Sequence, residues 1–222
     1  MRYRVNRIIV KSENAAKSVF QQSKFFVEEI RNLEPVSVSM DYGCGKLRYL
    51  KVYSKISDEV YLHDSEIQLF RQQSIFGKKQ SIAQYAKHKN YISLFGRHDV
   101  TTKKSIFDRI FCINVMSAIP ILSVRWRVLK NCFRLLKAGG ELVITHQYRN
   151  SDFTRMRNLP NAYEYRDGFV INSLRGHSFY STFSRETLIR RIEEYGFRIQ
   201  TTKIYDGTIF IVAMKDHLRC ES

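Results

Sequence analysis

The sequence predicts an α/β fold in which helices cover both faces of a doubly wound, mostly parallel sheet. Three observations support this prediction. Short apolar segments typical of strands alternate along the chain with segments of helical periodicity. Residues 107–115 are densely apolar, as expected of a strand buried on both faces. The chain also closes with two strand-like segments around Asp206-Gly207, a pair typical of tight hairpin turns, which adds an antiparallel C-terminal hairpin strand.

The chain is short enough to form one domain. It has 222 residues, only three prolines and no linker of low complexity. We therefore expect a single domain over residues 1–222, with an N-terminal helical segment over residues 1–34 and a substrate-side insert over residues 147–182. No stretch approaches the roughly 18 apolar residues of a membrane span. The four cysteines are scattered without a CxxC pair, which favours free thiols in the cytoplasm and predicts no metal site.

The first half of the chain alternates between helical and strand-like segments. Ser12 can cap the first helix, and Pro35 is expected to end it. The strands expected after this helix cover residues 36–40, 59–63 and 91–95, and the helical segments between them cover residues 46–56 and 65–89.

The second half contains the longest predicted helix. It is expected to begin at Pro120 and to end at Gly139-Gly140. The insert that follows is rich in aromatic residues and arginines but shows no clean period, so we expect it to be irregular and functional. Ser184 then caps a helix that Gly196 closes. The strands expected in this half cover residues 107–115, 141–145, 197–205 and 208–214.

The sequence Asp41-Tyr-Gly-Cys-Gly45 lies where the first predicted strand of the sheet meets a helix. Gly43 and Gly45 allow the backbone to turn sharply and to approach a ligand closely. Asp64 ends the next strand, 19 positions after Gly45, and its carboxylate can accept hydrogen bonds from both hydroxyls of a ribose. Ligands of parallel sheets bind beyond the carboxyl ends of the strands. The motif therefore predicts a nucleoside-containing cofactor.

The same residues distinguish between cofactors. A dinucleotide site needs a third glycine three positions after the second, where this chain has Arg48. The carboxylate of Asp41 would also repel a pyrophosphate. S-adenosyl-L-methionine has no phosphate, and its ammonium and sulfonium groups are favoured by a nearby carboxylate. The residues therefore favour S-adenosylmethionine over NAD.

Four motifs together resemble the seven-stranded, Rossmann-like, class I family of S-adenosylmethionine-dependent methyltransferases, over roughly residues 36–214. Asp41, Gly43 and Gly45 match the first motif, and Asp64 matches the ribose-binding acid. The other two matches are Phe107-Asp108 at the fourth strand and the Leu136-Lys-Ala-Gly-Gly140 segment before the fifth.

The resemblance implies a Rossmann-like fold, a methyltransferase activity and S-adenosyl-L-methionine as cofactor. The chain departs from the pattern at Leu47, where many members have a third glycine. The cofactor-binding residues that the resemblance implies are Asp41, Gly43, Cys44, Gly45, Asp64, Asp99 and Asn114.

The methyl acceptor is open at this point. A formal net charge of +16 favours a nucleic acid. A second hypothesis is a small-molecule acceptor under a lid formed by the insert, and a third is a binding module that kept the fold and lost the reaction. The sequence lacks both the Asp/Asn-Pro-Pro-aromatic segment of amino-methylating nucleic-acid enzymes and the Pro-Cys pair of cytosine C5 methylation.

Several polar side chains are candidates for contact with the acceptor. His146 and Tyr148 follow the fifth predicted strand and are the candidates for a catalytic role. Methyl transfer from a sulfonium needs no protonation of the leaving group, so the absence of an evident catalytic dyad is compatible with an enzyme. The aromatic and histidine residues that could form the lid are Tyr163, Tyr165, His177 and Tyr180.

Overall fold

The computed structural model describes residues 1–148 and 151–216, with the side chains of residues 151 and 152 left aside. Its main feature is a seven-stranded sheet of order β13-β14-β9-β8-β3-β4-β7. Five of these strands are parallel, and β14 pairs antiparallel with β9. The predicted Rossmann-like, mostly parallel seven-stranded sheet with an antiparallel C-terminal hairpin strand is confirmed. The strands are β3 (Val36–Tyr42), β4 (Ser57–His63), β7 (Ile92–Leu94), β8 (Phe107–Ile113), β9 (Leu136–Gln147), β13 (Phe197–Tyr205) and β14 (Thr208–Lys215).

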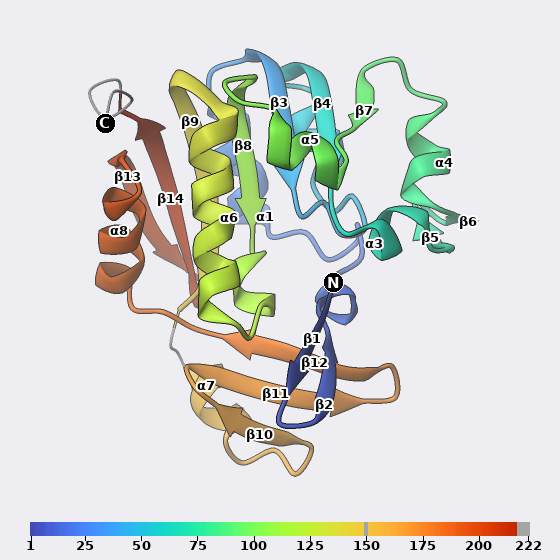
Figure 1. Ribbon diagram of the computed structural model, residues 1–222, viewed down its shortest axis with the longest axis vertical. Coiled ribbons are helices and arrows are strands. Elements are labelled where there is room, and N and C mark those ends of the chain that lie inside the picture. The colour runs from blue at the N-terminus through green and yellow to red at the C-terminus, as the bar shows by residue number, and fades with distance from the viewer. Residues whose placement is uncertain (149–150, 217–222) are drawn as a thin grey trace.

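Helices cover both faces of this sheet. In Figure 1, α5, α6 and α8 lie in front of the strands and α1 lies behind them. Successive residues of β8 point to opposite faces, because Ile110 packs with the α6 side of the core and Phe111 with the α1 and α2 side. This double burial explains the continuous apolar run of β8. The helices are α1 (Lys24–Arg31), α2 (Leu50–Tyr53), α3 (Glu66–Phe70), α4 (Ile82–Ala86), α5 (Arg97–Thr102), α6 (Leu122–Leu135) and α8 (Arg185–Glu194).

A second, five-stranded sheet of order β1-β2-β12-β11-β10 lies across the carboxyl ends of the parallel strands (Figure 1). The single-turn 3₁₀ helix η1 (Ser12–Ala15) connects its first hairpin to the rest of the chain, and α7 (Ser151–Met156) precedes its last three strands. Residues of both sheets share one hydrophobic core. The strands are β1 (Arg2–Val5), β2 (Ile8–Lys11), β10 (Ala162–Tyr165), β11 (Gly168–Ser173) and β12 (Gly176–Ser181).

This second sheet corrects two predictions. The N-terminal segment over residues 1–34 is not helical throughout, because it begins with two strands and its α-helix starts only at Lys24. The insert over residues 147–182 is not irregular, because most of it forms β10, β11 and β12. The two segments form one sheet by pairing with each other, since Val10 of β2 is the register partner of His177 of β12. The pairing of such distant segments cannot be read from the local sequence of either one.

Smaller corrections concern the boundaries of the elements. The helix predicted from Pro120 begins at Leu122 and ends at Leu135, so Gly139 and Gly140 lie inside β9 instead of ending a helix. A Cβ atom on Gly140 would lie 3.1 Å from the carbonyl oxygen of Phe107, so this glycine permits close strand pairing. Residues 65–89 form α3 and α4 around a hairpin of β5 (Gln73–Ile75) and β6 (Lys78–Gln80).

Other local predictions hold. The side chain of Ser184 caps α8 by accepting a hydrogen bond from the amide of Thr187 at 3.2 Å. Gly196 follows the helix with a φ angle of +90°. Asp206 and Gly207 both have positive φ in the turn between β13 and β14, as a tight hairpin turn requires. Among the described residues, no helix combines the length and the apolar character needed to cross a membrane.

Arg125 of α6 joins the two sheets. Its side chain is fully buried and forms a two-pronged ion pair with Asp167, which lies in the turn between β10 and β11, with an Nη2–Oδ1 distance of 3.1 Å. The guanidinium carbon also lies 5.3 Å from the ring centres of Phe179 and Phe183. A charge buried in this way is stabilised only while its partners remain in place. The contact therefore fixes the small sheet to α6.

Candidate functional site

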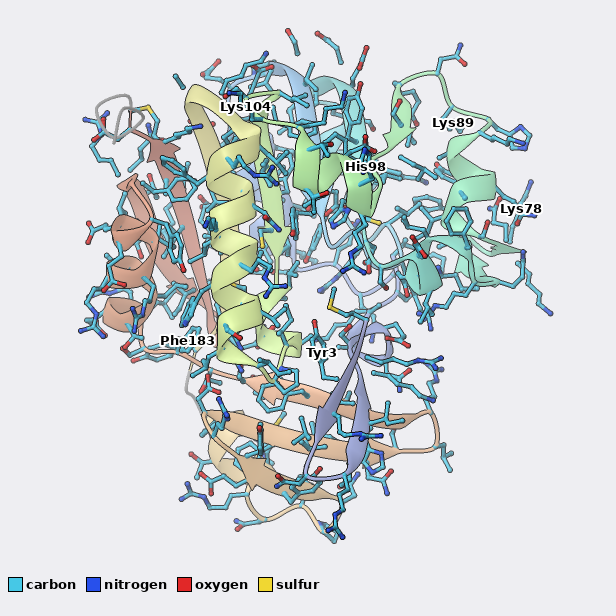
Figure 2. All side chains as sticks on the ribbon, in the orientation of Figure 1. Tyr3, Lys78, Lys89, His98, Lys104 and Phe183 are labelled. Carbon is cyan, nitrogen blue, oxygen red and sulfur yellow. The ribbon has the colours of Figure 1, made fainter. Side chains whose placement is uncertain are left out.

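A cavity of about 700 Å³ lies between the carboxyl ends of the parallel strands and the second sheet. The loop after β3, the end of β4 and the segment after β8 supply one wall. Tyr3 of β1 and Phe179 and Tyr180 of β12 supply the opposite wall. Figure 2 shows Tyr3 where the two sheets meet. The cavity has the size and the position of a ligand site in a doubly wound fold.

The glycine loop forms the floor of this cavity through backbone hydrogen bonds to β4. The amides of Gly43 and Cys44 donate to the carbonyl of His63 at 2.7 and 3.0 Å. Gly43 has a φ angle of +83°, and a Cβ atom there would lie 2.5 Å from Cγ2 of Val115. The position therefore has neither the backbone conformation nor the space for another residue.

We expect Gly43→Val to weaken binding of an adenosyl ligand by at least about 100-fold, because the loop must shift away from Val115. Isothermal titration calorimetry with S-adenosylhomocysteine measures this effect. Gly77→Val is the matched control, because Gly77 has a φ angle of +84° but nothing within 4 Å of its Cβ position. Equal affinity in the Gly43 variant and the wild type would remove the loop from the binding site.

Leu47 occupies the position where a third glycine is common in the resembling family. It adopts a φ angle of +61° and is fully buried. Its amide donates to the carbonyl of Cys44 at 2.8 Å. The backbone at position 47 thus keeps a left-handed conformation with a leucine in place of glycine. We attribute the tolerated strain to burial of the leucine side chain.

Cys44 lies in the same loop and lines the cavity, but its side chain is buried. Burial raises the pKa of its thiol well above the usual value, and the nearby Asp64 and Asp41 carboxylates raise it further. A thiol with a raised pKa is a poor nucleophile. Cys44 therefore serves as a small packing residue in the cavity wall.

Asp41 is a buried carboxylate in the cavity wall. It is 5% exposed and lies near the end of β3. Burial raises its pKa to about 8, and the charge of Asp64 contributes to the rise. No donor in the described part of the chain hydrogen-bonds its carboxylate. A carboxylate in this state is stabilised by a cation that enters the cavity.

Asp64 follows β4 and also lines the cavity. Its Oδ2 accepts a hydrogen bond from the amide of Gly45 at 3.0 Å, and its Oδ1 accepts one from the amide of Ser65 at 2.7 Å. Oδ1 also accepts a hydrogen bond from the hydroxyl of Ser65 at 3.3 Å, whereas Oδ2 can accept a second one. Asp64 therefore links the glycine loop to β4 and keeps acceptor capacity for hydroxyl groups.

Asn114 belongs to a chain of polar side chains along the cavity. Its Oδ1 accepts from Nε2 of Gln147 at 2.8 Å, and Oε1 of Gln147 accepts from the hydroxyl of Tyr180 at 3.1 Å. The three residues come from the end of β8, the end of β9 and β12. These hydrogen bonds thus connect the large sheet to the insert, and they place Tyr180 at the position predicted for the lid.

Three predicted site residues do not line the cavity. Asp99 caps α5, because its Oδ2 accepts from the amide of Gly96 at 2.9 Å. His146 is fully buried, stacks on Phe183 with ring centres 4.4 Å apart, and points away from the cavity. Burial lowers the pKa of His146 to about 4. Tyr148 pairs with Phe183 in an isolated bridge and is also outside the cavity wall.

Gln147 and His63 line the cavity, although the sequence patterns do not single them out as site residues. Gln147 follows the predicted His146 directly, and it faces the cavity because successive strand residues point to opposite sides. His63 ends β4, and its Nδ1 lies 2.9 Å from the carbonyl oxygen of Phe95. Burial lowers the pKa of His63, which favours the neutral imidazole. Its position at a strand end, directly before Asp64, was the available signal.

The predicted lid residues divide into two groups. Tyr180 lines the cavity, whereas Tyr163 and Tyr165 of β10 pack against the shared core. His177 pairs with Val10 where β12 meets β2 and is absent from the cavity wall.

Comparison with known proteins agrees with this geometry. Residues 16–202 match the family described as a methyltransferase domain. A curated relative, the uncharacterised protein YmfD of Escherichia coli strain K12, is 31% identical over 215 residues, which covers 95% of each chain.

Solved structures share the fold. A S-adenosylmethionine-dependent methyltransferase of Methanosarcina mazei has a TM-score of 0.61 at 15% identity, with 88% of this chain and 98% of that chain covered. The 1,6-didemethyltoxoflavin-N1-methyltransferase of Burkholderia thailandensis has a TM-score of 0.62 at 13% identity, with 92% and 84% covered. By the family match and the fold together, the chain belongs to the methyltransferase-domain family and has the Rossmann-like fold of its S-adenosylmethionine-dependent members.

Proposed function

We propose that the chain is an S-adenosylmethionine-dependent methyltransferase, active on a small molecule that is enclosed between the two sheets. The observation that carries the proposal is the convergence of the glycine loop, Asp41 and Asp64 on one cavity of about 700 Å³. The residues proposed to hold the cofactor are Asp41, Gly43, Cys44, Gly45, Asp64 and Asn114. We propose further that the two sheets form a single domain, since one core contains residues of both.

The residues fit this cofactor in charge and in shape. Asp41 is a buried carboxylate without a donor among the described residues, which suits a ligand that carries an ammonium and a sulfonium. Gly43 holds the loop in a left-handed conformation directly against Val115, which fixes the path of the backbone along the cavity. Oδ2 of Asp64 can accept a hydrogen bond from one ribose hydroxyl, and a second hydroxyl would replace the 3.3 Å hydrogen bond from Ser65 at Oδ1.

The cofactor supplies an electrophilic methyl group, which a nucleophile displaces in line from sulfur. The chain has to exclude water and align the acceptor, and Phe179 and Tyr180 of β12 are placed to do so. The hydrogen bond from Tyr180 to Gln147 fixes that wall relative to β9. We assign no catalytic base, since His146 and Tyr148 both lie outside the cavity wall.

Two observations favour a small molecule over a nucleic acid. The second sheet covers the cavity, and the Burkholderia methyltransferase of the same fold has a small molecule, 1,6-didemethyltoxoflavin, bound together with S-adenosylhomocysteine. In addition, part of the basic charge of α6 is internal. Arg125 is paired with Asp167, and the guanidinium of Arg134 donates to the carbonyl of Thr101 at 2.6 Å. Arg125 is therefore unavailable to phosphates, and Arg134 is held against α5.

The experiment uses S-adenosylmethionine with a radioactive methyl group. The protein is incubated with a low-molecular-weight cell extract and, separately, with total nucleic acid. We expect label in the small-molecule fraction only. Label in nucleic acid would overturn the proposed acceptor class. Calorimetric binding of S-adenosylhomocysteine without transfer to either fraction would favour a non-catalytic binding module.

Asp64→Ala is expected to weaken the affinity for S-adenosylhomocysteine by about 1.5–3 kcal/mol, because an ionised acceptor of hydroxyl hydrogen bonds is lost. Asp64 also accepts from Gly45, so part of the loss can come from the loop. Asp64→Asn separates the two effects, since its amide oxygen still accepts from Gly45. We expect an intermediate affinity for Asp64→Asn by calorimetry. Unchanged affinity in both variants would show that Asp64 does not bind the ligand.

A further inference from the structure

A second, smaller cavity of about 330 Å³ opens beside the first. Its wall comes from η1, the loop after β3, the segment that follows α3 and the turn between β11 and β12. Glu13, Ala16 and Lys46 line both cavities, so the two share a wall. A ligand in the larger cavity can therefore extend a substituent toward the smaller one.

Three cations from separate parts of the chain line the smaller cavity: Lys46, Arg71 and Arg175. Glu13 is the acid in this wall, and its carboxylate is already engaged by the amino group of Met1 at 3.1 Å and by Nε of Arg2 at 3.6 Å. Within residues 1–148 and 151–216, none of the three cations forms an ion pair with a carboxylate. The cavity is consequently positive.

Hydrogen bonds to η1 hold two of these cations in place. Nη2 of Arg71 donates to the carbonyl of Glu13 at 3.1 Å, and the side chain of Asn14 donates to the carbonyl of Arg175 at 2.7 Å. Nε of Arg71 is buried and has no acceptor in the described part of the chain. Burial lowers the pKa of Lys46, and the charges of Arg175 and Arg71 lower it further. The three cations thus repel one another, and a bound anion would relieve that repulsion.

We propose that the smaller cavity binds an oxyanion, the phosphate or carboxylate group of the methyl acceptor, between Lys46, Arg71 and Arg175. Arginine and lysine donate charge-assisted hydrogen bonds to such groups, and the planar guanidinium presents two parallel donors. The inference rests on the proposed function, because the shared wall sets the anion beside the site of methyl transfer. It narrows the acceptor to a small molecule with an acidic substituent.

The test uses inorganic phosphate as the probe, in calorimetric titrations of the full chain at constant ionic strength. We expect millimolar affinity for phosphate and a loss of about three- to tenfold in Arg71→Met and in Arg175→Met, since each removes one charged donor. Arg175 is exposed in a turn, so its variant is expected to fold normally. Lys104→Met is the control, because Lys104 is exposed near the top of the view in Figure 2, well away from Tyr3.

S-adenosylhomocysteine is titrated into the same samples. Normal binding of this ligand together with no binding of phosphate would overturn the anion site and leave the proposed function intact. Absence of S-adenosylhomocysteine binding would contradict the proposed function itself. Competition between phosphate and S-adenosylhomocysteine would assign the three cations to the cofactor site and overturn the proposal. A loss of phosphate affinity in Lys104→Met as large as in the two arginine variants would show that phosphate is attracted by the overall charge of the protein. Another outcome concerns a single-stranded oligonucleotide. If the protein binds it but not free phosphate, and Arg175→Met weakens this binding, the proposed acceptor is a nucleic acid and not a small molecule.

Discussion

Asp41→Asn is expected to stabilise the cofactor-free protein at pH 8 by about 2 kcal/mol and to weaken cofactor binding at least about tenfold. The two effects have one cause. Ionised Asp41 is buried without a hydrogen-bond donor among the described residues, so its charge costs folding free energy. The same charge attracts a cationic ligand. Asparagine is uncharged, so the substitution removes both the cost in folding free energy and the attraction for a cationic ligand.

The effect on stability depends on pH in a defined direction. The pKa of Asp41 is about 8 in the folded protein and about 3.9 in an unfolded chain. Between these values the folded state binds more protons, so the stability from this group is fully present below pH 4 and is lost as the pH rises through 8. We therefore expect the stability gap between Asp41→Asn and the wild type to be absent near pH 4 and largest above pH 8.

Urea unfolding across this pH range measures the gap, and calorimetry measures the affinity. Asp58→Asn is the control, because Asp58 is an exposed carboxylate on β4. The wild type should also bind S-adenosylmethionine more tightly as the pH rises toward 8, whereas Asp41→Asn should lack this dependence. A constant stability gap from pH 4 to pH 9 would show that Asp41 is not protonated in the folded protein.

Arg125→Ala is expected to destabilise the protein by about 3–5 kcal/mol, because it leaves the carboxylate of Asp167 without its partner and opens space between α6 and the small sheet. Chemical unfolding monitored by circular dichroism gives the value. Binding of S-adenosylhomocysteine should weaken at the same time, since Phe179 of the cavity wall packs against the guanidinium.

Arg190→Ala provides the comparison for this prediction. Arg190 pairs with Glu194 on the surface of α8 at 3.9 Å, and its side chain is 67% exposed. Surface pairs of this kind contribute less than about 1 kcal/mol. Similar losses in Arg125→Ala and Arg190→Ala would mean that the buried pair does not hold the sheets together.

The large sheet was predictable because its signals are local. The glycine loop, the carboxylate after β4 and the apolar run of β8 are each read within a few residues. The small sheet was missed because its two halves pair across the chain, with Val10 beside His177. One signal was nonetheless present: residues 2–5 alternate between exposed arginines and the buried side chains of Tyr3 and Val5.

The residues of the candidate site also differ in whether the local sequence predicts them. Asp41, Gly43 and Asp64 reach the cavity because the strand ends alone fix their positions. His146 does not, because the pleat of β9 turns Gln147 rather than His146 toward the cavity. The positive cluster of Lys46, Arg71 and Arg175 has no sequence pattern, since its members come together only when the turn between β11 and β12 reaches η1.

The pairing of β2 with β12 also has a consequence for the order of folding. The strand of Val10 is synthesised first, yet its partner near His177 emerges only 167 residues later. Closing so long a loop is slow, because the entropy must be lost before the contacts form. The pairing of β2 with β12, in the sheet that covers the cavity, is therefore expected to form among the last contacts. Contacts that form late are often the first to open, which would give small molecules a way in and out while the large sheet stays intact.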